Sequence, residues 1–169
     1  MRQVPDTMRI VHPGIFMKKT LLAAVAAGVL LFAAQSASAG SDMDAASLAA
    51  LKSYTLSMDK INAMQAASDE AAKMPGLAEK GHHVGDNAKT VAEMEAKLNA
   101  IPQLAALYKK HGLSAHDAVV MPFVLMDAGM VVMYPAAAKT LGDRTSPAQV
   151  AFYKQHQAEL KKVKWVNGG

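Results

Sequence analysis

Histidine and methionine are the side chains of this sequence best suited to bind a metal ion, and residues 40–169 contain five histidines and nine methionines. Imidazole and thioether together are typical of copper sites, and imidazole alone also suits zinc. Several of the methionines, however, recur at the spacing of a buried helix face, where methionine usually fills space. A copper or zinc site is therefore one alternative, and its candidate ligands are His82, His83, His111 and His116.

Haem binding without a covalent link is a narrower form of the same hypothesis. A helical bundle can hold haem b between a methionine of one helix and a histidine of another. Met58 and His156 have these types and lie near opposite ends of the helical region. Covalent haem attachment through Cys-x-x-Cys-His is excluded, because the sequence has no cysteine. The competing interpretation is that His156 is half-buried and hydrogen-bonded to a neighbouring helix.

Motifs typical of hydrolytic enzymes do not occur in the sequence, which has no Gly-x-Ser-x-Gly, no His-Glu-x-x-His and no glycine-rich phosphate loop. One arrangement resembles the start of an acid–base site. His116, Asp127 and Tyr134 are separated by eleven and seven residues, which places them on one face of a helix. A buried Asp127 either has a shifted pKa or is a paired structural group. We expect the paired group, and no enzymatic activity.

The elements that must position these side chains are all helices. Apolar residues recur every three or four positions, and no stretch alternates polar and β-branched residues over the length of a strand. We therefore predict an all-α fold, a bundle of about four to five helices. The expected helices cover residues 57–73, 86–101, 102–111 and 114–138, and a last one begins at Ser146, while residues 77–85 are expected to form a flexible connection.

The helix expected over residues 114–138 is hydrophobic on almost every side. Such a helix is either the centre of a bundle or embedded in a membrane. We predict the central position, because Asp127, Pro122 and Pro135 interrupt the apolar run and the other helices have apolar faces that need a partner. Membrane association through residues 118–138 is the alternative.

Residues 17–39 have the pattern of a secretory signal. Lys18 and Lys19 precede an apolar run over residues 21–34, and small residues up to Ala39 complete a cleavage site. The apolar run is shorter than the roughly 20 residues of a membrane-spanning helix. We expect cleavage after Ala39 and a periplasmic or secreted product with no stable transmembrane anchor.

This signal divides the chain into three parts. Residues 1–16 are expected to be a misassigned upstream extension, residues 17–39 the signal peptide, and residues 40–169 a single helical-bundle domain. Removing residues 1–39 takes away four of the eighteen basic side chains and one of the fourteen acidic ones, which leaves a formal charge of +1. A nearly neutral domain argues against nucleic acid as the partner.

Three parts of the expected domain resemble a group of small exported bacterial proteins that are uncharacterised. The resemblance lies in helix starts and turns, at residues 54–60, at residues 102–104 with 111–114, and at residues 146–153. It implies an exported helical protein. The group has no assigned activity, so the resemblance implies no chemistry.

These observations together predict a non-enzymatic exported protein that acts as a binding or interaction module. Its partner is expected to be an unknown protein or a small apolar ligand, and no cofactor is expected. The alternatives are a periplasmic protein that binds copper, zinc or non-covalent haem, and a membrane-associated protein.

Overall fold

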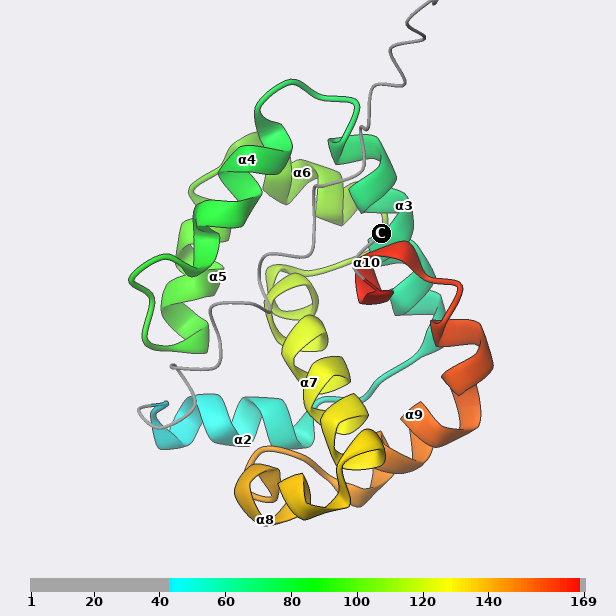
Figure 1. The fold of residues 1–169 in the computed structure, drawn as a ribbon. Coiled ribbons are helices and arrows are strands. Elements are labelled where there is room, and N and C mark those ends of the chain that lie inside the picture. The colour runs from blue at the N-terminus through cyan, green and yellow to red at the C-terminus, as the bar shows by residue number, and fades with distance from the viewer. Residues whose placement is uncertain (1–42, 168–169) are drawn as a thin grey trace, which may run out of the picture.

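The computed structural model describes residues 43–167, and every regular element in that range is helical. The predicted all-α fold is therefore confirmed. Figure 1 shows the arrangement. The α-helices are α2 (Ala45–Ser53), α3 (Met58–Ala71), α4 (Leu77–His82), α5 (Val91–Asn99), α6 (Pro102–Lys110), α7 (Ala115–Met133), α8 (Ala138–Leu141), α9 (Pro147–Leu160) and α10 (Lys164–Asn167), and two 3₁₀ turns cover His83–Gly85 and Pro135–Ala137.

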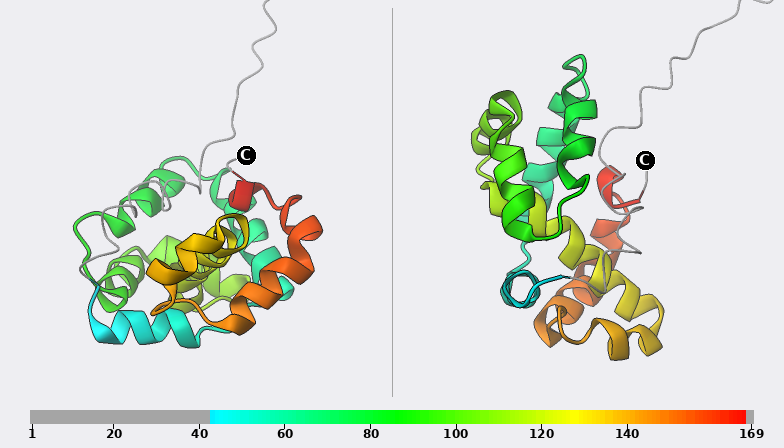
Figure 2. Two further views of the ribbon diagram at one scale, coloured as in Figure 1. Left: turned by 60° about the horizontal axis from the view of Figure 1, so that its bottom comes forward. Right: turned by 90° about the vertical axis from the view of Figure 1, so that its left-hand side faces the viewer.

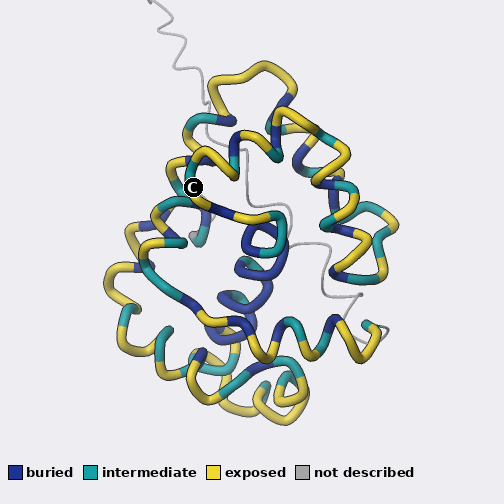
Figure 3. Tube along the Cα trace, turned by 180° about the vertical axis from the view of Figure 1, so that it is seen from behind, coloured by how far each residue is buried: buried dark blue, intermediate teal, exposed yellow. Residues whose placement is uncertain are grey.

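Helix α7 is the central element of the fold. It contacts α2, α3, α5, α6 and α9, and its trace is mostly buried in Figure 3. Val120, Met121 and Val124 are completely inaccessible to solvent. The helix is hydrophobic on nearly all sides because it is surrounded by other helices over most of its length. The prediction of a buried apolar central helix is correct.

Local capping signals determine where several helices begin. The hydroxyl oxygens of Ser57, Ser114 and Ser146 each accept a backbone N–H from the first turn of α3, α7 and α9. All three starts follow from the sequence pattern. Helix α5 begins later than the predicted residue 86, because Asn87 has a positive φ of 57° and Thr90 is the residue that caps the helix.

Residues 77–85 do not form the flexible connection that the sequence suggested. They fold into α4 and a 3₁₀ turn, with Leu77 and Val84 buried in the core. The segment is too short to show a helical period, so its buried apolar side chains gave no clear signal. Helix α3 ends at Ala71, slightly before the expected Lys73.

Helix α7 is also shorter than predicted, since it ends at Met133 instead of residue 138. A proline disfavours helical geometry at the residue before it. Tyr134, which precedes Pro135, has φ −131° and ψ 85° and lies outside the helix. The chain then forms the 3₁₀ turn Pro135–Ala137 and the short helix α8, which lies at the opposite end of the molecule from α4 and α6 (Figures 1 and 2).

Candidate functional site

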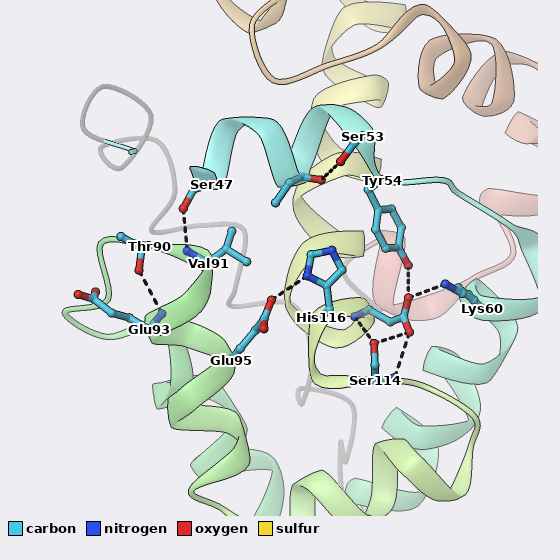
Figure 4. Close-up of polar contacts among 12 residues, drawn as sticks. Ser47, Ser53, Tyr54, Lys60, Thr90, Val91, Glu93, Glu95, Ser114 and His116 are labelled. Carbon is cyan, nitrogen blue, oxygen red and sulfur yellow. Dashed lines mark hydrogen bonds and ion pairs between the residues drawn. The ribbon is translucent and has the colours of Figure 1, made fainter. Parts of the chain in front are cut away.

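The largest polar cluster among the described contacts surrounds Asp117, in the first turn of α7 (Figure 4). One carboxylate oxygen accepts hydrogen bonds from Tyr54 Oη at 2.9 Å and from Lys60 Nζ at 2.6 Å. The other oxygen accepts the Ser114 hydroxyl at 2.6 Å and the Ser114 backbone N–H at 3.0 Å. The cluster therefore ties the α2–α3 connection and α3 to the start of α7.

The electrostatics of this cluster suit a structural anchor better than a catalytic group. Burial alone would raise the pKa of Asp117, but the hydrogen bonds from Lys60, Ser114 and Tyr54 outweigh it and hold that pKa well below its ordinary value. Burial, together with the hydrogen bond to Asp117, raises the pKa of the Tyr54 phenol. A carboxylate that stays ionised and a phenol that stays protonated do not exchange protons near neutral pH.

The four candidate metal ligands are spread over the molecule. His83 Nδ1 lies 2.6 Å from Asp86, and His111 Nε2 lies 2.9 Å from Glu70. His116 Nδ1 lies 2.7 Å from Glu95, while Nδ1 of His82 is buried without a hydrogen bond. Within residues 43–167, no three histidine or acidic side chains are placed to hold a metal ion together. The copper or zinc site stays a prediction.

The two candidate haem ligands have other neighbours in the structure. The His156 ring lies 4.5 Å from the Phe152 ring, centroid to centroid, and its Nδ1 is 3.5 Å from Glu159. Met58 is partly buried and packs against the hydrophobic core. Haem binding between them stays a prediction.

The three residues that resembled an acid–base site do not come together. His116 and Asp127 are eleven positions apart on α7, which separates them by roughly 16 Å along the helix axis. Asp127 is 1% exposed and forms a two-point ion pair with Arg144, at 2.7 and 2.8 Å. Burial raises the pKa of Asp127, and Arg144 opposes this. Tyr134 lies beyond the end of α7 and is 60% exposed.

A groove that sequence reasoning missed lies between the end of α3, the start of α4, and α6. Its volume is about 550 Å³, and its lining is mainly apolar. The lining includes the buried side chains of Leu77 and Leu107 and the exposed Met74. The sequence marks Met74 only as part of a helix stop, because nothing local indicates that α6 packs beside it.

Charged side chains also line this groove. Both oxygens of Glu70 accept hydrogen bonds from Lys110 Nζ, at 2.6 and 2.8 Å. His111 Nε2 lies 2.9 Å from one of these oxygens. These contacts hold the pKa of Glu70 below its ordinary value, and the hydrogen bond from Lys110 has the largest effect. Lys73, by contrast, has no ion-pair partner among residues 43–167. The lining therefore has one unpaired positive charge.

A second surface feature is the exposed end of α7. The helix Ala115–Met133 is long and apolar enough to cross a membrane, although 61% of its most apolar window is buried inside the protein. Met130, Met133 and Tyr134 are nevertheless 38%, 56% and 60% exposed. These three large side chains are neighbours in the sequence and together expose an apolar surface to water.

Comparison with known proteins adds no assignment. No protein-family model, no curated protein and no solved structure matches this chain. The resemblance to exported bacterial proteins therefore stays an expectation, and function must be argued from the surfaces described above.

Proposed function

We propose that this is an exported, non-enzymatic binding protein, periplasmic or secreted after cleavage following Ala39, whose site is the groove between α3, α4 and α6. The observation that carries the proposal is the groove itself. Its volume of about 550 Å³ falls in the range of about 300–1,000 Å³ that is usual for small-molecule sites. Its apolar lining favours a small apolar ligand.

The charges at the groove narrow the class of ligand. Glu70 is neutralised by Lys110, and Lys73 has no such partner within residues 43–167. A ligand with an apolar body and one anionic group would place the body against Leu77 and Leu107 and its charge near Lys73. We therefore propose a small anionic amphiphile as the ligand class.

The polar clusters support binding instead of catalysis. The acceptor positions of Asp117 are occupied by Tyr54, Lys60 and Ser114, and Asp127 is held by Arg144. The Asp117 carboxylate, with both oxygens already accepting hydrogen bonds, stabilises the fold and has little capacity left for a substrate.

Two fluorescent naphthalene probes of similar size test this proposal. Phenylnaphthylamine is neutral, and anilinonaphthalene sulfonate has one negative charge. We expect both to bind the wild-type protein. Ala106 is an exposed residue of the groove lining, so Ala106→Phe fills the groove without changing the core and should weaken both probes about tenfold or more. Lys73→Gln should weaken only the anionic probe, about two- to fivefold.

The matched control is Ala96→Phe, which changes an exposed alanine of α5 that does not line the groove. It should leave both affinities unchanged. Circular dichroism of each variant shows that the fold is kept, so that probe binding to partly unfolded protein is recognised. Equal affinities for wild type and Ala106→Phe, or no binding by the wild type, would contradict the proposal.

A further inference from the structure

The exposed end of α7 and the turn after it form a surface that the proposed ligand site does not use. We define residues 130–138 as the apolar tip. Met130, Met133 and Tyr134 are its large exposed side chains, and Pro135, Ala136 and Ala138 are exposed beside them. The tip includes the 3₁₀ turn Pro135–Ala137 and leads into α8, at the end of the molecule away from α4 and α6 (Figure 1).

One exposed basic residue and one exposed acidic residue lie near the tip in the sequence. Residues 128–142 contain a single charged side chain, the exposed Lys139. Of the two acidic residues that flank this stretch, Asp127 is buried against Arg144, and only Asp143 is exposed. The tip itself has no acidic side chain and is followed directly by Lys139, whereas Asp143 lies four residues beyond that lysine. An apolar surface with a cation at its border is complementary to an anionic lipid surface.

The size and composition of the tip also favour lipid over a protein partner. A stable protein interface uses about 20–30 residues on each side, whereas the tip has nine, of which several are alanine or proline. Insertion into the headgroup region needs only a few apolar side chains. Tyrosine, with an apolar ring and a polar hydroxyl, is suited to that boundary.

In this fold most of the same helix is enclosed by protein. Val120, Met121 and Val124 are fully enclosed by neighbouring helices and cannot face lipid without loss of the core. Within this fold, the part of α7 that can contact a membrane surface is its exposed end.

We propose that the apolar tip docks the protein peripherally on an anionic membrane surface. Met133 and Tyr134 enter the headgroup region, and Lys139 lies at the level of the lipid phosphates. The groove between α3, α4 and α6 lies apart from the tip residues and stays open to ligand.

Vesicle sedimentation tests this proposal with the exported protein, purified from the periplasm or the medium. One set of vesicles is phosphatidylcholine alone, and the other contains an equal part of phosphatidylglycerol. We expect binding to the anionic vesicles. The double variant Met133→Ser/Tyr134→Ser should reduce it about tenfold, because two apolar side chains no longer leave water. Lys139→Gln should reduce the preference for the anionic vesicles over the neutral ones.

The control is the double variant Ala92→Ser/Ala96→Ser, at exposed positions of α5 that lie outside both the groove lining and the tip. It should leave vesicle binding unchanged. Equal sedimentation of the wild type and Met133→Ser/Tyr134→Ser, or no sedimentation of the wild type, would overturn the proposal. A third outcome would also overturn it: the wild type forms a dimer in light scattering, Met133→Ser/Tyr134→Ser is a monomer, and neither binds vesicles. The tip would then be an interface between two copies of this chain.

Discussion

At the scale of single residues, the Asp117 carboxylate shows how a polar group can stabilise an otherwise apolar fold. It accepts hydrogen bonds from Tyr54, Lys60 and Ser114, which lie in three separate segments of the chain. Because these partners favour the ionised form, the carboxylate stabilises the fold despite its burial. The same side chain completes the capping box of α7, so one residue joins local and long-range structure.

Replacing Asp117 with asparagine is expected to lower the free energy of unfolding by about 2 kcal/mol. The amide has one acceptor oxygen and no charge, so the hydrogen bonds from Lys60 and Ser114 are weakened or lost. Chemical denaturation measures the change. Asp69→Asn is the matched control, because Asp69 is exposed and lies 3.5 Å from the exposed Lys164, so its effect should stay below about 0.5 kcal/mol. Equal losses in the two variants would contradict the role given to Asp117.

The pH dependence of stability follows from the same carboxyl groups. Asp117 and Glu70 have pKa values below their ordinary value in the folded protein. The unfolded chain therefore takes up protons at a higher pH than the folded one. The stabilisation is complete above about pH 5 and is lost as the pH falls through about 4 and below. Urea denaturation from pH 7 to pH 3 should show this decrease, and it should be shallower in Asp117→Asn. A decrease of the same size in that variant would be inconsistent with the assignment.

At the scale of elements, what could be predicted from the sequence is what short-range chemistry determines. Ser114 and Ser146 indicate helix starts, because a cap and its partner are three residues apart. Helix α4 was missed, because its apolar residues are buried by α6 and the core, which are distant in the sequence. The groove was missed for the same reason: Met74 and Leu107 are 33 positions apart, and no local pattern indicates that they share a surface.

The contact between α9 and α2 is a long-range feature, and it is made by Gln149, the same residue that caps α9. Gln149 completes the capping box of α9 through its side-chain oxygen, which accepts the Ser146 backbone N–H. Its Nε2 donates to the backbone oxygens of Leu51 and Tyr54, both at 2.8 Å. The pattern predicted the first contact but not the second, which fixes α9 against the end of α2.

Replacing Gln149 with leucine should therefore destabilise the protein by about 2 kcal/mol or more. The shape of the side chain is nearly kept, but the Tyr54 carbonyl loses its side-chain donor and the Ser146 N–H loses its side-chain acceptor, while the Leu51 carbonyl keeps only the Tyr54 N–H at 3.3 Å. Gln155→Leu, at an exposed position of the same helix, is the control and should have little effect. Denaturation midpoints of the two variants measure the difference. If both variants match the wild type, the link between α9 and α2 contributes nothing to stability.

At the scale of the whole molecule, α7 separates the two proposed surfaces. Its buried part forms the core on which α3 and α6 pack, and these helices line the groove. Its exposed end leads into the apolar tip. A single apolar helix thus explains both the stability of the fold and a place where large apolar side chains are exposed together to solvent. The sequence showed that α7 was apolar, but its division into a buried part and an exposed end depends on where the other helices stop.

This division predicts opposite outcomes for the same substitution at two positions of α7. Val124 is fully buried, so Val124→Asp places an unpaired charge in the core and should lower the free energy of unfolding by more than about 4 kcal/mol, a large part of the about 5–15 kcal/mol of an ordinary domain. Met133 is 56% exposed, so Met133→Asp should change the stability by less than about 0.5 kcal/mol while it weakens vesicle binding. Circular dichroism and thermal unfolding without detergent measure the first effect, and sedimentation with anionic vesicles measures the second. If α7 instead crossed a membrane, the wild type would need detergent to remain in solution. The difference in stability between Val124→Asp and Met133→Asp would then not be seen without detergent.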